Sequence, residues 1–303
     1  MTVSIMNETL RLGTRGSALA RAQSGLVADA IDGSVELVLI STAGDRSSAP
    51  VESIGGTGVF VSALRDALLA GEIDLAVHSY KDLPTAPADG LVIAAVPERA
   101  DARDALIARD GLGLAELPAG SRVGTGAPRR MAQLRAARPD LEFVPIRGNV
   151  DTRLRKVSEG ELDAVVLAAA GLDRLGRSGE ITELLDPAVV TPAPAQGALA
   201  VECRVGDMVE LLSPLDHPQS RATVAAERAM LAKLESGCHA PIGGFAQIHN
   251  DNLVLRGMAA ALDGSVVVRR EATGSITDAE RLGHGLATEL LAAGVSDLLG
   301  SSR

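Results

Sequence analysis

A short apolar run that ends in a polar or glycine-containing loop, followed by the start of a helix, recurs along this chain and constrains its fold. In one copy a strand at 123–125 leads to a helix start at 128–130, and in another a strand at 141–146 leads through the loop 147–149 to a helix over about 150–158. The runs have the length and composition of buried strands, and Pro128 suits a first helical turn. Strands that alternate with helices in this way predict an α/β fold.

The first hundred residues repeat the pattern. A strand at residues 10–12 meets a helix at 18–30, where Ser17 is a helix cap or, with Arg15, part of an anion site. A second strand, over 35–40, reads as buried, and a helix is expected over 59–70. The strand 73–77 runs into Lys81 and Asp82, which form a solvated turn pair or belong to a site at the strand's carboxyl end.

The last third of the chain predicts a return to the first lobe and then a separate α+β domain. A strand over 198–203 leads to a helix over 218–235, a meander of three antiparallel strands and a closing helix over 278–293. The expected domains are 1–100 with a return segment at 197–216, 101–196, and 217–303.

Composition excludes several functions. Four aromatic residues and a net charge of −10 argue against nucleic-acid binding, which needs stacking platforms and basic surface. No apolar stretch is long enough to cross a bilayer, and no metal-binding spacing occurs. Because no such spacing occurs, we expect no bound metal. Two cysteines do not make a disulfide framework, so we expect a cytoplasmic protein.

The basic residues gather in one window. Residues 121–155 hold eight arginines, no lysine and three acidic residues. Guanidinium groups match carboxylates and phosphates with two parallel donors, so this window predicts recognition of planar oxyanions. Arg135, Arg138 and Arg155 fit a solvated helix face, whereas the other arginines near strand ends fit a binding cleft.

One cysteine lies in a turn. Cys238 is surrounded by glycine and proline over residues 236–244, so its thiol should be reachable at a loop tip. A loop cysteine without a function is the alternative, because such signatures rarely stand without distant partners. Cys203 alternates with apolar neighbours and reads as a buried small residue.

Five motifs in chain order resemble the porphobilinogen deaminase (hydroxymethylbilane synthase) family. They are residues 14–17, 77–84, 123–130, 147–153 and 237–243, which span nearly the whole chain. The resemblance implies two lobes like type II periplasmic binding proteins flanking a cleft, plus a small C-terminal domain with an antiparallel three-stranded sheet. It also implies a monomeric transferase that condenses four porphobilinogen molecules, with loss of ammonia, to hydroxymethylbilane for haem and other tetrapyrroles.

The resemblance assigns residues to roles. Cys238 holds a dipyrromethane cofactor through a thioether, and Asp82 is the catalytic residue, by proton transfer or by electrostatic stabilisation of a cation. The cofactor is also bound by Ser17, Lys81, Asp82, Thr125, Arg129, Arg130, Asn149 and Arg153. The substrate is bound by Arg15, Gln23, Arg147, Arg174 and Gln196.

Some positions depart from the family pattern. Thr57, Ser53 and Gly16 replace residues that are basic or amide-bearing in many members, and Ala127 lies in a loop that is otherwise serine-rich. Backbone N–H groups are expected to replace the missing hydroxyl contacts. The competing hypothesis is a two-lobed carboxylate-binding module without catalysis, which would need neither Cys238 nor Asp82.

Overall fold

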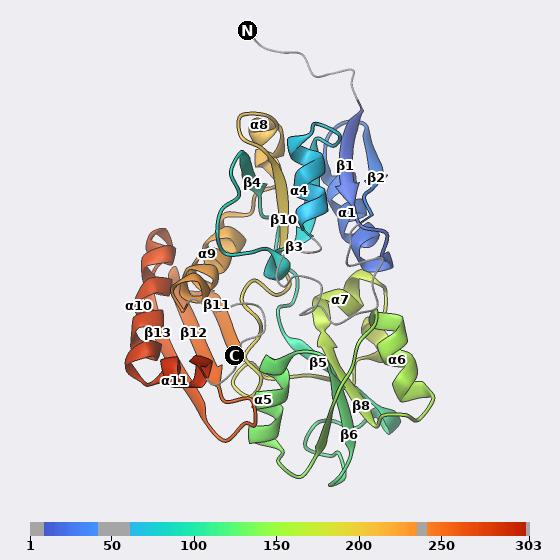
Figure 1. The fold of residues 1–303 in the computed structure, drawn as a ribbon, viewed down its shortest axis with the longest axis vertical. Coiled ribbons are helices and arrows are strands. Elements are labelled where there is room, and N and C mark those ends of the chain that lie inside the picture. Colours follow the sequence, from blue (N-terminus) through green and yellow to red (C-terminus); the bar gives the residue numbers. More distant parts are fainter. Residues whose placement is uncertain (1–8, 42–60, 235–240, 301–303) are drawn as a thin grey trace. The chain divides into compact units, whose positions relative to one another are not determined.

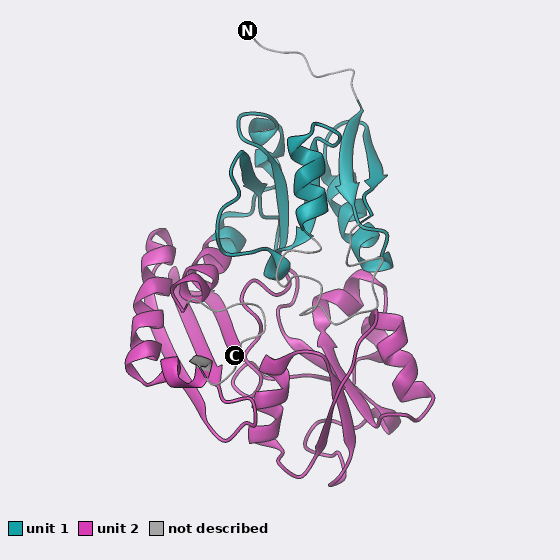
Figure 2. Ribbon diagram, viewed as in Figure 1, with its two compact units in different colours: residues 1–99, 198–221 teal, residues 100–197, 222–303 magenta. Residues whose placement is uncertain are grey.

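The computed structural model describes residues 9–41, 61–234 and 241–300. The chain divides into two compact units (Figure 2). Unit 1 comprises Met1–Arg99 and Ala198–Arg221, and unit 2 comprises Ala100–Gly197 and Ala222–Arg303. Unit 2 therefore holds both the second expected lobe and the C-terminal part, and the three-domain division stays a prediction.

Unit 1 is built on a five-stranded sheet with the order β2-β1-β3-β10-β4 (Figure 1). Its strands are β1 (Leu10–Thr14), β2 (Val35–Leu39), β3 (Leu75–Ser79), β4 (Leu91–Ala95) and β10 (Leu199–Arg204). β1 is parallel to β2 and β3, whereas β10 is antiparallel to β3 and β4. The helical segments of this unit are α1 (Ala18–Ala30), α4 (Ser62–Leu69), η1 (Tyr80–Asp82), α8 (Val209–Leu212) and η4 (Ser213–Leu215).

The core of unit 1 forms where α1 covers the sheet. Leu12, Val27 and Leu75 are buried in one cluster with residues of β10. The predicted helix over 18–30 is confirmed, and so is the return of the chain to this lobe as β10. The prediction that the strand at 35–40 is buried is wrong, because β2 is an edge strand and Leu39 is 61% exposed.

The first sheet of unit 2 has the order β7-β6-β8-β5-β9. Its strands are β5 (Asp104–Ala108), β6 (Arg122–Thr125), β7 (Glu142–Pro145), β8 (Ala164–Ala168) and β9 (Glu183–Leu184). β6 is parallel to β7 and β8, whereas β5 is antiparallel to β8 and β9. The helical segments beside this sheet are η2 (Arg109–Gly111), α5 (Pro128–Ala137), α6 (Val150–Ser158), α7 (Ala169–Arg174) and η3 (Ser178–Glu180).

The two five-stranded sheets share one topology. In each, three parallel strands are followed by an antiparallel strand from elsewhere in the sequence and then by a fifth strand. This strand order is that of a type II periplasmic-binding-protein lobe, and it confirms the predicted fold class for each lobe. The predicted cleft between the lobes stays a prediction.

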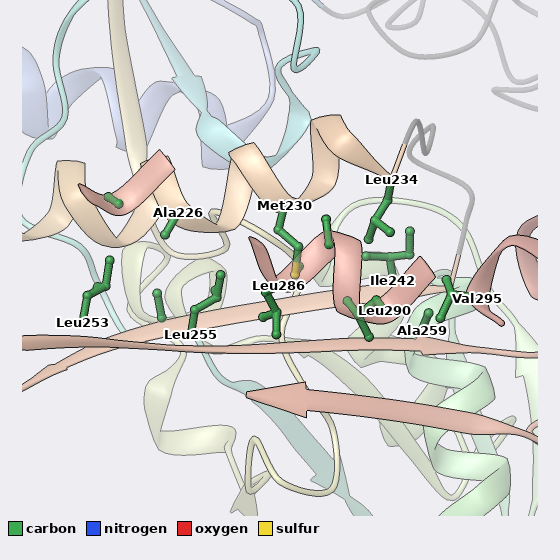
Figure 3. Packing of buried hydrophobic residues seen from close by; sticks show 13 residues of the cluster. Ala226, Met230, Leu234, Ile242, Leu253, Leu255, Ala259, Leu286, Leu290 and Val295 are labelled. Carbon is green, nitrogen blue, oxygen red and sulfur yellow. The ribbon is translucent and has the colours of Figure 1, made fainter. Parts of the chain in front are cut away.

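The C-terminal part of unit 2 is a three-stranded antiparallel sheet, as predicted. Its elements are α9 (Pro218–Lys233), which begins in unit 1, β11 (Ile242–His249), β12 (Asn252–Ala260), β13 (Val267–Ser275), η5 (Ile276–Asp278), α10 (Ala279–Ala292) and α11 (Val295–Gly300). Met230, Leu286 and Leu290 are fully buried between the helices and the sheet (Figure 3). Gly283 lets α10 approach α9 closely, because a Cβ there would lie 2.2 Å from the carbonyl oxygen of Ala226.

No helix among the residues that the structure describes has the length and apolar character that a bilayer crossing would require.

Candidate functional site

The arginine-rich window, residues 121–155, includes the carboxyl ends of parallel strands in the first sheet of unit 2. The carboxyl ends of the parallel strands β6, β7 and β8 meet at one edge of that sheet, and α5, α6 and α7 begin close after them. Because β5 is antiparallel, its first residue, Asp104, is aligned with Ala168 at the carboxyl end of β8. Helix N-termini and guanidinium groups at one edge favour bound anions.

Arg129 and Arg130 share a buried carboxylate. Both are 5% exposed, and Asp104 between them is completely buried. Arg130 Nε donates to Asp104 Oδ1 at 2.8 Å, and Arg129 Nη2 lies 2.8 Å from Oδ2. The second contact is an ion pair without hydrogen-bond geometry, since Oδ2 accepts no hydrogen bond among the described residues. One negative charge therefore faces two positive charges.

The ionised state of Asp104 follows from these contacts. Burial alone raises the pKa of this carboxyl, but the charges of Arg129 and Arg130 and hydrogen bonds from Gln196 and Arg130 lower it to about 2. Burial in turn lowers the pKa of Arg129, with partial compensation by Asp104. The carboxylate is thus charged at neutral pH.

Further protein groups hold the two arginines in place. Arg129 Nη1 donates to the carbonyl oxygen of Thr191, which also accepts from Gln133 Nε2 at 3.1 Å. Arg130 Nη1 donates to the carbonyl oxygen of Val166 at 3.0 Å. Gln196, predicted to face the substrate, is completely buried and donates to Asp104 Oδ1 at 2.8 Å.

Arg153 and Arg174 differ from that pair. Among the described residues, no carboxylate lies within ion-pair distance of either guanidinium; Arg153 Nε donates to Gly148 O at 2.8 Å and Arg174 Nη2 to Gly197 O at 2.6 Å. Burial lowers the pKa of Arg174 to about 10, and burial with the nearby charge of Arg130 lowers that of Arg153. Partly buried cations of this kind are prepared for an anionic ligand.

The remaining predicted residues of this unit lie at the end of β6 or in the loop after β7. Asn149 caps α6, with its side-chain oxygen accepting from Thr152 N at 2.9 Å, and Thr125 is completely buried at the end of β6. Arg147 is exposed just before that cap. Ala127 gives α5 no side-chain cap. The expected replacement of hydroxyl contacts by backbone N–H groups stays a prediction.

In unit 1 the predicted residues lie after the strands β1 and β3 or on the helix α1. Lys81 and the exposed Asp82 are in η1, directly after that strand. Gln23, predicted to bind substrate, is buried and donates to Ser79 Oγ at 2.9 Å. Ser17 caps α1 by accepting from Ala20 N at 3.2 Å, and Arg15 is half-buried in the loop before it. The structure thus brings Gln23 to the strand that leads into Lys81 and Asp82.

A buried ionic cluster supports that strand. Glu202 on β10 is 1% exposed and accepts from Arg65 Nε at 3.0 Å. His78 on β3 places its Nε2 3.1 Å from the same carboxylate. Burial raises the pKa of Glu202, yet the contact with His78 and the hydrogen bonds from Arg65 lower it overall. β3 and α4 are therefore both anchored on β10.

Several predictions fall outside the described residues: the cofactor cysteine Cys238, and the departures at Thr57 and Ser53. Within the described ranges, no group of three or more His, Cys, Asp and Glu side chains is placed to hold a metal ion. Cys203 is fully buried, as predicted, and burial raises its pKa.

Sequence reasoning missed the acidic partners. No strand was expected over residues 104–108, where β5 lies with Asp104 at its start. The run Ala105-Leu106-Ile107-Ala108 was the available signal. Glu202 lies inside the strand expected over 198–203, and nothing in the local sequence marked it as a partner of Arg65. Arg138, expected on a solvated helix face, has a side chain that is only 19% exposed: it pairs with Asp140 at 2.7 Å and donates to the carbonyl oxygen of Leu117 at 2.7 Å.

Comparison with known proteins gives consistent matches. Residues 10–210 match the family profile "Porphobilinogen deaminase, dipyromethane cofactor binding domain", and residues 221–292 match "Porphobilinogen deaminase, C-terminal domain". The porphobilinogen deaminase of Nocardia farcinica is 57% identical over 96% of this chain and 88% of its own. That of Mycolicibacterium paratuberculosis is 54% identical over 97% of this chain and 98% of its own.

A solved structure, the BvgS VFT2 domain of Bordetella pertussis, is 16% identical and covers 73% of this chain and 92% of its own. Its TM-score of 0.41 is too low to bear on the fold.

Proposed function

Because the chain belongs to the porphobilinogen deaminase family, we propose that it joins four porphobilinogen molecules head to tail, releases ammonia and forms hydroxymethylbilane. The observation that carries this proposal is the match of residues 10–210 to the dipyrromethane cofactor-binding domain of that family. The geometry of unit 2 agrees with it, because partly buried guanidinium groups that have no carboxylate at ion-pair distance within the described ranges suit a ligand that carries several carboxylates.

The residues fit a dipyrromethane whose rings carry acetate and propionate groups. Arg153, with help from Thr125 and Asn149, would hold its carboxylates together with Arg129 and Arg130, and Ser17 and Lys81 would contribute from unit 1. An ion pair at about 4 Å is worth roughly 4 kcal/mol at an effective dielectric near 20, before desolvation. Several arginines are therefore needed on a protein whose net charge is −10.

Cys238 would attach the cofactor through a thioether, since a thiolate is a soft nucleophile suited to an electrophilic methylene carbon. When bound, the dipyrromethane supplies the terminal pyrrole carbon to which each new unit is joined. Arg15, Arg147 and Arg174 would bind the carboxylates of the incoming porphobilinogen. Gln23 and Gln196 would also bind the substrate, from side chains that are buried in this structure.

Asp82 would be the catalytic residue. Its carboxylate can accept hydrogen bonds from pyrrole N–H groups and stabilise the cation that forms as ammonia leaves. Its exposed position directly after β3, which is anchored by the His78–Glu202 contact, suits that role. The same carboxylate can also move a proton.

Replacing Asp82 by Asn tests this role. We expect ammonia release to fall roughly 100-fold or more, because the carboxylate charge is lost while the shape is kept. Circular dichroism should show an unchanged fold. Asp89→Asn, which neutralises an exposed carboxylate seven positions along the chain, is the control and should keep wild-type turnover. Substantial activity in the Asp82 variant would remove it from the catalytic role.

We also propose that the enzyme works as a monomer in the cytoplasm. The low cysteine content, typical of proteins that do not depend on disulfides, supports the location. Light scattering during size-exclusion chromatography would test the monomer; a dimer mass at micromolar concentration would contradict it.

A further inference from the structure

Asp104 touches three residues of the proposed site at once, yet it belongs to none of the motifs that define that site. Its Oδ1 accepts hydrogen bonds from Arg130 Nε and Gln196 Nε2, both at 2.8 Å. Its Oδ2 lies 2.8 Å from Nη2 of Arg129. The two carboxylate oxygens are thus divided between the two arginines.

This division fixes the arginines separately. Two guanidinium groups close together repel each other, and in a buried site that repulsion is poorly screened. Asp104 cancels one of the two charges, so the pair can lie side by side before any ligand is present. One net positive charge remains for an anion. Backbone carbonyl groups of Thr191 and Val166 complete the positions of the guanidinium groups.

We infer that Asp104 is a positioning residue for cofactor capture: its carboxylate sets Arg129 and Arg130 in the arrangement that receives the dipyrromethane carboxylates. The inference rests on the proposed function, because it concerns the cofactor of that reaction. Asp104 itself does not contact the reacting atoms. It acts through the two arginines and through the amide of Gln196.

Two substitutions separate the charge from the position of the carboxylate. Asp104→Asn keeps the shape but leaves one acceptor oxygen, which can serve only one of the arginines. Asp104→Glu keeps both oxygens and moves them by one methylene group. Asp140→Asn is the matched control, because Asp140 is an exposed carboxylate paired with Arg138 at 2.7 Å in the same unit.

The measurement is the rate at which each protein, prepared without adduct, gains the two-pyrrole mass on incubation with porphobilinogen, followed by intact mass spectrometry. Circular dichroism at the same temperature reports the folded fraction. We expect capture by folded Asp104→Asn to be at least roughly ten-fold slower than wild type. Asp104→Glu should be faster than Asp104→Asn, and Asp140→Asn should match wild type.

The outcomes are distinct. The positioning role would be overturned if folded Asp104→Asn captured the adduct at the wild-type rate. It would also be overturned if folded Asp104→Asn, folded Asp104→Glu and the control all captured it at the same rate. If Asp104→Asn does not fold, a slowed but folded Asp104→Glu supports the role. Failure of both to fold would overturn it in favour of a purely structural one. If wild type gains no adduct at all, the proposed function itself fails.

Discussion

Four buried or partly buried arginines of the proposed site in unit 2 fall into two kinds. Arg129 and Arg130 are compensated by Asp104, whereas Arg153 and Arg174 have no carboxylate at ion-pair distance among the described residues. Burying a charge without a partner is unfavourable, and such costs concentrate at binding sites. Arg153 and Arg174 should therefore be the residues where stability and ligand affinity oppose each other.

Arg174→Met tests that opposition. Methionine keeps the aliphatic length and removes a charge whose pKa burial lowers to about 10, so the free energy of unfolding of the protein without cofactor should rise by about 1 kcal/mol. The KM for porphobilinogen should rise at least roughly ten-fold, since an ion pair to substrate is lost. Urea denaturation and steady-state ammonia release measure the two effects.

The control for this variant is Arg155→Met, which removes an exposed arginine 3.7 Å from Glu159 and should change neither quantity. A less stable Arg174→Met protein with unchanged KM would show instead that the hydrogen bond to Gly197 is the main role of Arg174.

The sequence was sufficient to predict the arginines but not their acidic partners. Runs of arginine without lysine are a local signal, and they indicated an oxyanion site from residues 121–155 alone. Asp104 meets Arg129 and Arg130 only because β5 enters the sheet antiparallel to β8. That pairing depends on strand order, which no local pattern encodes. The burial of Gln23 and Gln196 was not predicted either, because it also depends on contacts between distant segments that no local pattern encodes.

At the scale of elements, the junction between β6 and α5 determines how closely the loop approaches the neighbouring strand. A Cβ at Gly126 would lie 2.6 Å from the carbonyl oxygen of Ile146, directly after β7, and 3.7 Å from the guanidinium nitrogens of Arg153. The missing side chain thus lets the loop pack against the backbone of the next junction. The helix and strand types here were predictable, but this close approach was not.

Gly126→Ala should push the two junctions apart. We expect a loss of about 1–3 kcal/mol in the free energy of unfolding, because a backbone atom must move to make room, together with slower gain of the two-pyrrole adduct. Thermal unfolding and intact mass measure these effects. Gly179→Ala is the control, since a Cβ there meets nothing within 4 Å; equal stability of the two variants would contradict the packing argument.

At the scale of the molecule, an acidic protein must hold a product that gains carboxylates with each unit added. The chain has a net charge of −10 and concentrates arginines at one edge of one sheet, while Lys81 and Asp82 follow a strand of the other five-stranded sheet. The repeated strand-loop-helix pattern predicted an α/β fold, and the family resemblance implied two lobes, but the strand order that the two sheets share was not predicted. The position of Cys238 lies outside the described residues.

The most direct test of the central claim is the intact mass of the purified protein, before and after incubation with porphobilinogen, with peptide mapping of residues 231–247. We predict an added two-pyrrole mass on Cys238, present at purification or gained on incubation, and larger adducts as substrate is added. A chain that stays unmodified and releases no ammonia would contradict the account and leave a binding protein without catalysis.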